Sequence, residues 1–315
     1  MTSPHRTLAL TALAPITWGT TYLVASELLP ADRPLLAATL RALPAGLALV
    51  ALTRLRPTGA WWGRALVLGT LNIGAFFPLL FLAAFRLPGG VAATLGAVQP
   101  LVAAGLAAAV LGERVRTTTV LAGIAGVAGV ALLVLRADAQ LDGVGVLAGL
   151  GGAVAMASGV VLTKRWGAPV PLLAFTGWQL LAGGLVLVPI ALLVEGAPPS
   201  PTAANVAGFV WLATVGTAVA YALWFRGIAA LPVSQVVFLG LLSPVVAAIS
   251  GWLVLGQTLT IGQLAGVVIV LGAVWSTQQQ GSLKWGRERR TVSVALPPRP
   301  GANRVDVSAS QCPSG

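Results

Sequence analysis

The sequence predicts an all-α integral membrane protein in which ten transmembrane helices form two five-helix inverted repeats. The first observation is composition: 57% of the 315 residues are hydrophobic and 9% are charged, whereas a soluble domain carries about 25% charged residues. The second is a series of ten apolar stretches, most of them close to the ~20 residues that cross a hydrocarbon core of ~30 Å. The third is an internal repeat that relates the two halves of the chain.

In the first half, five apolar stretches follow one another, separated by short segments with proline, glycine or charge. The first follows His5 and Arg6 as a secretory signal would, but Pro15 disfavours cleavage after Ala14, so we expect a retained helix. The expected spans are 8–28, which contains Trp18-Gly19; 34–53, which contains Arg41; 64–86, which begins at Arg64; 91–111, which contains Gln99-Pro100; and 118–135, which is rich in glycine.

The second half contains five more apolar stretches, and its gaps are equally short. The most distinct gap is Pro198-Pro199-Ser200-Pro201, a run that no transmembrane helix tolerates. The expected spans are 145–163, which ends before Lys164; 170–194, which contains Trp178-Gln179; 205–225, which ends before Arg226; 233–255, which contains Ser243-Pro244; and 260–277, which begins before Gly262.

An internal sequence repeat relates these two halves. Leu87-Pro88, Gln99-Pro100 and Leu111-Gly112-Glu113 return 144 positions later as Leu231-Pro232, Ser243-Pro244 and Leu255-Gly256-Gln257. Each half, 1–138 and 139–280, holds five spans. Because five is odd, equivalent helices must cross the membrane in opposite directions, which predicts inverted topology.

Lysine and arginine residues orient the bundle. Outside the tail after Gln280, nine of them lie on the side of the N-terminus and three on the other side. The positive-inside rule therefore places both termini in the cytosol, in what we expect to be the inner membrane of a bacterial-type cell. The last segment, 281–315, is polar and basic, so we expect it to be disordered and to lie near anionic lipid headgroups. The net charge of +11 is therefore topological and does not indicate a nucleic-acid partner.

Arg41 is the one charged residue well inside an expected span. Intramembrane charges are costly and tend to face a cavity or a partner. Arg41 is therefore a candidate to bind a substrate carboxylate. The alternative is that it reaches the membrane surface or bonds carbonyls at a helix end.

Proline kinks are expected at Pro100 and Pro244, which occupy equivalent places in the repeat beside Gln99 and Ser243. Proline removes a backbone hydrogen bond, so carbonyl groups near Gly96 and Gly240 are expected to face a cavity. The alternative is a kink that only shapes the bundle. Both interpretations place these residues near a pathway.

Four other residues at mid-membrane depth are candidates for substrate binding: Trp18, Asn72, Ser158 and Gln179. Phe76 and Tyr221 are further candidates, as parts of an aromatic wall with Phe77 and Trp224. The amides can both donate and accept hydrogen bonds. Their alternative role is interhelical bonding, worth roughly 0.6–2 kcal/mol. The aromatic residues alternatively fill space, and Tyr221 and Trp224 fall near the inner interface, where aromatic belts are common.

Two helix faces made of small residues indicate close helix packing, either within the chain or in a homodimer. One face contains Gly123, Gly126 and Gly129, and the other contains Gly262 and Gly266. Glu113 lies at a helix end, where we expect it to pair with Arg114 or Arg116.

Motifs for catalysis are absent from the sequence: there is no phosphate-binding loop, dinucleotide fingerprint, catalytic triad or metal-binding set. The single cysteine, Cys312, cannot form an intrachain disulfide. We therefore expect no enzyme activity, no cofactor and no metal. All eight acidic residues fall at expected helix ends, in loops or in the tail.

The chain resembles EamA-type proteins of the drug/metabolite transporter superfamily in the order and spacing of four short motifs. These are Trp18-Gly19, Arg41, Pro100 and Leu111-Gly112-Glu113. The resemblance covers about residues 8–278, and Gln257 departs from it where the first copy has Glu113. It implies a basket of ten helices around a central cavity that opens alternately to the two sides, lined by spans 1, 3, 4, 6, 8 and 9. Asn72, Gln99, Ser158 and Ser243 should face this cavity.

The resemblance implies a membrane transporter that exports small organic metabolites, amino-acid-like or drug-like, by alternating access. An importer or facilitator with the same fold is the alternative in direction. A membrane receptor or scaffold without transport is the alternative in class, although it leaves the inverted repeat and its paired kinks unexplained.

Overall fold

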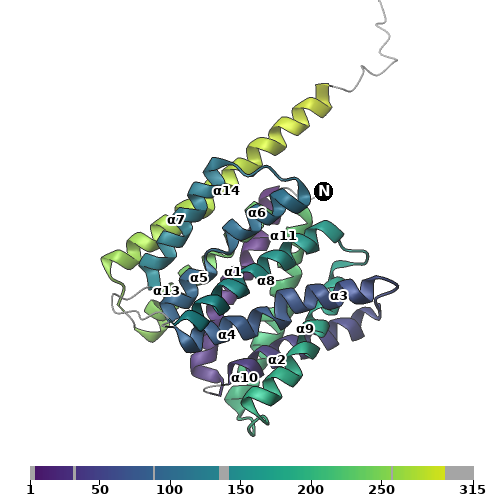
Figure 1. Ribbon diagram of the computed structural model, residues 1–315, viewed down its shortest axis with the longest axis vertical. Coiled ribbons are helices and arrows are strands. Elements are labelled where there is room, and N and C mark those ends of the chain that lie inside the picture. Colours follow the sequence, from purple (N-terminus) through teal and green to yellow (C-terminus); the bar gives the residue numbers. More distant parts are fainter. Residues whose placement is uncertain (1–3, 31–32, 88, 135–141, 257, 295–315) are drawn as a thin grey trace, which may run out of the picture.

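The computed structural model describes residues 4–30, 33–87, 89–134, 142–256 and 258–294, and within these ranges the regular structure is helical (Figure 1). Ten segments are long and apolar enough to cross a membrane. Each matches an expected span, and their ends differ from the expected ones by five residues at most. The all-α fold class with ten transmembrane helices is confirmed.

Six spans are single α-helices, and the other four consist of two or three pieces. The single helices are α1 (Pro4–Leu28), α2 (Pro34–Thr53), α7 (Thr117–Val134), α8 (Gly143–Trp166), α9 (Leu172–Glu195) and α14 (Ile261–Val294). The divided spans are α3 (Trp61–Gly69), η1 (Thr70–Gly74) and α4 (Phe76–Arg86); α5 (Gly89–Gly96) and α6 (Gln99–Leu111); α10 (Ala203–Ala213), η2 (Thr214–Val219) and α11 (Ala220–Ala230); and α12 (Val233–Leu239) and α13 (Leu242–Leu255).

Two of the divided spans contain a turn of π-helix where the apolar pattern predicts a regular α-helix. In η1 the amide of Ala75 donates to the carbonyl of Thr70, five residues back, at 2.6 Å. The second π-helix, η2, begins at Thr214, which is 144 positions after Thr70 and follows the spacing of the sequence repeat. A π-turn widens the helix and shifts the register of side chains on its two sides, and such turns are frequent at functional sites.

The other two divided spans break at equivalent places. Helix α5 ends at Gly96, and α12 ends at Leu239, one residue before Gly240. Pro100 and Pro244 each lie in the first turn of the helix that follows, α6 and α13. A missing amide hydrogen is tolerated there because the first amides of a helix have no partner within it. The prolines therefore start new helices and do not bend continuous ones.

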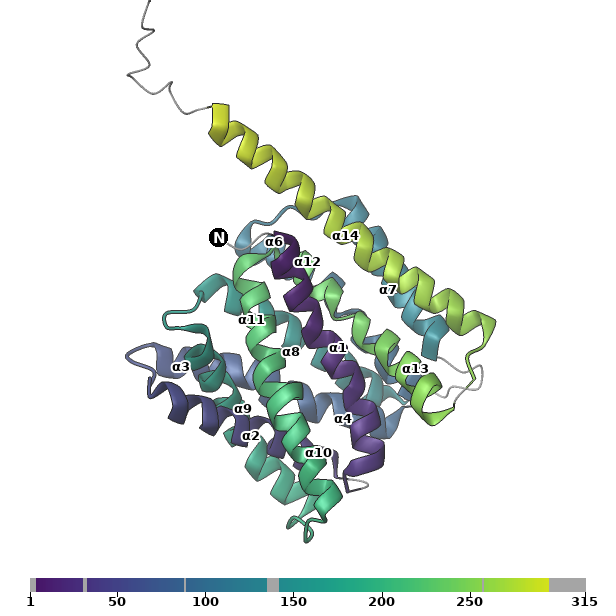
Figure 2. The ribbon, with the colours of Figure 1, turned by 180° about the vertical axis from the view of Figure 1, so that it is seen from behind.

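Helices α7 and α14 lie side by side (Figure 2) and approach closely through glycines. A β-carbon added to Gly266 would lie 2.6 Å from the carbonyl oxygen of Gly129. Gly123 and Gly126 pack against the side chains of Leu101 and Leu241. Gly123, Gly126, Gly129 and Gly266 therefore serve packing within the chain, whereas Gly262 is exposed and a β-carbon there would meet only Oγ1 of Thr260, at 3.9 Å.

At one end of the bundle, called the Arg33 end, polar groups join α2 to α9. The guanidinium of Arg33 donates to the carbonyl oxygens of Glu195 and Ala197. The carboxylate of Glu195 accepts from the amides of Leu35 and Leu36 in the first turn of α2. Glu195 therefore satisfies helix-end amides that no residue within α2 can bond.

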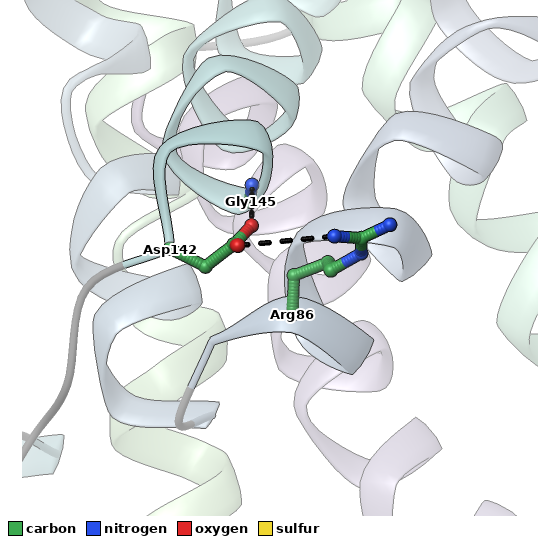
Figure 3. A network of polar contacts seen from close by, with 3 residues as sticks. All are labelled: Arg86, Asp142 and Gly145. Atoms are coloured by element: carbon green, nitrogen blue, oxygen red, sulfur yellow. Dashed lines mark hydrogen bonds and ion pairs between the residues drawn. The ribbon is translucent and has the colours of Figure 1, made fainter.

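Also at the Arg33 end, Asp142 links the two halves (Figure 3). Its Oδ1 accepts from the amide of Gly145 at 2.7 Å and caps α8, and its Oδ2 lies 3.8 Å from Nη1 of Arg86 in α4. Both charged side chains are well exposed, so the ion pair contributes about 0–1 kcal/mol. The cap is the stronger structural element of the two.

At the opposite end, called the Lys164 end, the contacts differ from those expected. The ammonium of Lys164 donates to the carbonyl oxygens of Ala229 and Leu231 at 3.1 and 2.9 Å. Oε1 of Glu113 accepts from the amide of Val233 at 3.3 Å, at the start of α12. The expected pairing of Glu113 with the neighbouring arginines is wrong, because the carboxylate lies over the unsatisfied amides of a helix start.

Helix α14 runs to Val294 and extends beyond the bundle (Figure 1). The expected disorder from Gly281 therefore does not hold for 281–294, where the sequence has no proline and the helix continues. Residues 295–315 lie outside the described part of the chain.

Candidate functional site

A cavity of about 420 Å³ lies in the middle of the bundle and extends to the Arg33 end, where its lining includes Leu29, Pro30 and Arg33. This volume suits a small organic molecule. All six spans expected to line the cavity contribute residues to it. The second span contributes as well, through Pro34, Ala37, Ala38 and Arg41, so both halves build the wall.

Aromatic side chains form two groups in the lining of this cavity. In the first group, the ring centroid of Trp18 lies 5.2 Å from that of Tyr221 and 5.1 Å from that of Trp224. In the second group, the Phe76 and Phe77 centroids lie 5.3 Å apart, and the Phe81 ring lies 6.0 Å from that of Phe77. Such distances are typical of interacting aromatic pairs.

Tyr221 and Trp224 lie deeper than the sequence analysis places them. Both are buried, and both line the cavity. Their span continues to Ala230, whereas the expected span ends at residue 225, so they are farther from the interface than counted. Their place in the lining favours the expected aromatic wall over the alternative of an interfacial belt.

Arg41 lines the cavity and is 7% exposed. Its Nε donates to Oγ1 of Thr217 at 2.9 Å, and its Nη2 donates to the carbonyl oxygen of Gly216 at 2.8 Å. Both partners belong to η2, and the guanidinium carbon lies 5.2 Å from the centroid of Phe77. Arg41 thus does not extend to the membrane surface; it bonds the π-helix and presents a positive charge to the cavity.

The carbonyl oxygen of Gly216 connects two cavity residues, because Nε1 of Trp18 also donates to it, at 3.2 Å. A carbonyl oxygen has two lone pairs and can accept both hydrogen bonds. The π-turn therefore fixes Trp18 from α1 and Arg41 from α2 around one backbone atom.

The helix breaks meet at this cavity. Gln99, Pro100, Ser243 and Pro244 all line it. So do Gly96 and Gly240, the two positions where exposed carbonyl groups were expected. The repeat thus places its paired breaks in the lining of one cavity.

Three candidates lie outside the lining. Nδ2 of Asn72 donates to Oε1 of Gln179 at 2.8 Å, and both side chains are 0% exposed. Helix α8 turns Met156 to the cavity, and Ser158, two residues on, is not among the lining residues because positions i and i+2 do not share a helix face. The expectation that Asn72 and Ser158 face the cavity is not met here, and substrate binding by these three stays a prediction.

Sequence reasoning missed Thr21, which lines the cavity from α1. It lies three residues after Trp18, and this helical spacing places both on one face, which is a usable signal. Among the described residues, Oγ1 of Thr21 and Nε1 of Trp224 are buried without a hydrogen-bond partner. Thr21 and Trp224 share the lining with the other polar residues of the cavity, Arg33, Arg41, Gln99, Tyr221 and Ser243.

No group of three or more metal-ligating side chains occurs in the part of the chain that the structure describes. The chemistry of the site is therefore built from Arg41, indole, hydroxyl and amide groups on an apolar wall.

Comparison with known proteins agrees with this architecture. The profile of the EamA-like transporter family matches residues 5–135 and 143–277. Protein PecM of Dickeya dadantii is 47% identical over 263 residues, which cover 83% of this chain and 88% of that protein. A probable amino-acid metabolite efflux pump of Salmonella typhimurium is 30% identical over 220 residues, covering 65% and 73%. A protein crystal structure with 21% identity has a TM-score of 0.77 and covers 89% of this chain and 99% of its own, so the two share a fold.

Proposed function

The chain belongs to the EamA-like transporter family and is a multi-pass membrane transporter, and on this premise we propose that it exports small organic molecules by alternating access. The observation that carries the proposal is the central cavity, which both halves line and which extends to one end of the bundle. The Salmonella relative is described as a probable amino-acid metabolite efflux pump, which supports export as the direction.

The lining of the central cavity reaches the Arg33 end and includes no described residue of the Lys164 end, and this one-sided extent supports alternating access. Toward the Lys164 end, Phe225, Ile228, Val233 and Val236 are at most 1% exposed. Nε2 of Gln235 donates to the carbonyl of Gln278 at 3.2 Å, and Nε2 of Gln278 donates to the carbonyl of Gln235 at 3.1 Å. These contacts join α12 to α14.

We assign the Lys164 end to the cytosol and the Arg33 end to the outside. The distribution of lysine and arginine supports this orientation, which also puts both termini in the cytosol. With it, the structure corresponds to an outward-facing conformation. The shared offset of the two π-helices and the two helix breaks supports an inverted repeat as the device that exchanges the two conformations.

Cysteine labelling tests the pathway. In a Cys312→Ser background, Gln99→Cys and Ser243→Cys should react quickly with a membrane-impermeant maleimide, because both positions line the cavity. Asn72→Cys and Gln179→Cys should react at least about tenfold more slowly, since both native side chains are fully buried in their mutual contact. Mass spectrometry of the labelled protein gives the rates. Equal labelling at all four positions would contradict the assigned pathway.

A second prediction concerns energy coupling. Glu113, Asp142 and Glu195 all bond backbone amides at helix ends, and none of them lines the cavity. Glu27 lies in α1 beyond Ala25, where the apolar span ends. We propose that transport runs down the substrate gradient or exchanges solutes, because proton-coupled carriers use a membrane-buried titratable group.

Counterflow in liposomes, screened with radiolabelled amino acids, nucleosides and small carboxylic acids, tests both export and coupling. Counterflow should proceed at full rate at equal pH on both sides and in Glu27→Gln. Uptake that needs a pH gradient and vanishes in Glu27→Gln would refute uncoupled transport. Failure of every solute to exchange would favour a receptor or scaffold.

A further inference from the structure

We propose that the Lys164 end carries a binding site for an anionic phospholipid beside α3 and α8, in which Arg64 holds the lipid phosphate. The inference goes beyond the proposed function, because it concerns a bound lipid and can be measured without transport. The leaflet, the cytosolic one, rests on the orientation proposed above, but the binding does not. Three features carry the inference: the contacts of Arg64, the charge around it and the apolar surface next to it.

The guanidinium of Arg64 contacts two indole rings. Its central carbon lies 5.1 Å from the ring centroid of Trp61, three residues earlier in α3, and 5.6 Å from that of Trp166, the last residue of α8. Aromatic faces attract a cation but offer no lone pair to its N–H groups. Within the described part of the chain, no oxygen accepts from these groups. The two rings therefore position a planar set of donors that suits a phosphate.

A basic loop lies against the same rings. The ring centroid of Trp61 lies 6.4 Å from that of Trp178, and Nε1 of Trp178 donates to the carbonyl of Leu55 at 2.8 Å. Leu55 belongs to the loop between α2 and α3, which lies at the edge of the bundle in both views (Figure 1, Figure 2). Arg54 and Arg56, on either side of Leu55, are exposed. The contacts of Trp178 thus bring two more cations to the indole rings.

The positive charge of this surface is not balanced within the described part of the chain. Arg165, next to Trp166 near the end of α8, is exposed and adds a fourth arginine. None of the four, Arg54, Arg56, Arg64 and Arg165, forms an ion pair with a described residue. Such a surface attracts a headgroup with a net negative charge, whereas the choline or ammonium group of a zwitterionic lipid is repelled.

The apolar surface next to Arg64 favours a lipid over a soluble phosphate. Arg64 lies three residues inside a membrane span that begins at Trp61, which is the depth of the headgroups. Toward the membrane interior, Val67 follows Arg64 after one turn of α3 and is 41% exposed. Leu162, one turn before Trp166 in α8, is partly exposed. Acyl chains can cover Val67 and Leu162 while the phosphate meets Arg64.

Native mass spectrometry of the purified full-length protein measures the preference, with phosphatidylglycerol and phosphatidylcholine as the probes. The first phosphatidylglycerol should bind about tenfold more tightly than the first phosphatidylcholine, because several arginines act on its net charge. Arg64→Gln should weaken the binding of phosphatidylglycerol about tenfold, since hydrogen bonds to a charged group are lost. Arg64→Lys keeps the charge without the planar donors and should weaken it about threefold.

Arg116→Gln is the matched control. Arg116 is exposed in the segment between α6 and α7, at the Lys164 end, and has no ring contact among the described residues. Its replacement removes the same charge from the same end of the bundle. The affinity for phosphatidylglycerol should therefore stay within about twofold of the wild-type value.

Photocrosslinking locates the lipid. A phosphatidylglycerol with a diazirine in its acyl chain, in nanodiscs of phosphatidylcholine, should label peptides that contain Val67 and Leu162. Millimolar glycerol phosphate should not displace it, because the soluble compound lacks the acyl chains. The labelling pattern of the wild-type protein decides the question even where a variant does not fold.

The lipid site is wrong if phosphatidylcholine binds as tightly, if Arg64→Gln and Arg116→Gln weaken binding equally, or if the label falls only on other helices. Displacement of the lipid by glycerol phosphate would assign the arginines to a soluble phosphate instead. Counterflow separates this result from the proposed function. Lipid binding without counterflow of any solute would refute transport and keep the lipid site, whereas counterflow without a preference for phosphatidylglycerol would do the reverse.

Discussion

Linking α12 to α14 at the Lys164 end should stop transport. Gln235 and Gln278 bond each other's backbone there, so cysteines at these positions lie within reach of a short crosslinker. In a Cys312→Ser background, Gln235→Cys/Gln278→Cys treated with a bis-methanethiosulfonate reagent should lose at least about nine-tenths of its counterflow, because alternating access requires this end to open.

Reduction of the crosslink should restore counterflow in the same sample. The two single-cysteine variants, treated with the same reagent, control for modification without linkage. Full counterflow in a sample shown by peptide mapping to be crosslinked would mean that the Lys164 end does not open by separation of α12 and α14.

Replacement of Gly266 by valine should destabilise the protein more than any other single substitution considered. The new β-carbon would lie 2.6 Å from the carbonyl oxygen of Gly129 and 2.8 Å from the amide nitrogen of Leu133. Both are backbone atoms of α7, so no side chain can rotate away and the two helices must separate. We expect a cost of about 1–3 kcal/mol or more.

Gly272→Val is the matched control, because Gly272 lies in the same helix and a β-carbon there would meet nothing within 4 Å. Thermal denaturation followed by size-exclusion chromatography compares the two variants. Equal melting temperatures would show that α7 and α14 are not held at the distance that the structure gives.

The spans could be predicted from the sequence because the thickness of the bilayer fixes their length and apolar character. The two π-turns could not. They change hydrogen bonding over a few residues and leave the hydrophobic pattern intact, so η1 and η2 read as ordinary helix. The end of the eighth span was also placed too early, which moved Tyr221 and Trp224 toward the interface.

The candidate residues were predicted from their depth in the membrane, and depth alone does not tell which way a side chain points. Gln99 and Asn72 are both amides expected near the middle of the membrane, yet Gln99 lines the cavity and Asn72 is buried against Gln179. The difference is the side of the helix on which each lies, and for Asn72 a π-turn sets that side. Arg41 could be predicted to line a cavity because a charged side chain inside a transmembrane span has few other places that stabilise its charge.

The paired π-turns have a consequence for the ancestry of the chain. The same family profile matches both halves, and both π-turns begin at threonines that are 144 positions apart. Independent origin of such turns at equivalent places would require two separate insertions, whereas duplication of a gene that already encoded one requires a single event. The side chains then diverged, since Asn72 and Gly216 now occupy equivalent positions with different partners. The backbone of the binding site is therefore older than the contacts that now use it.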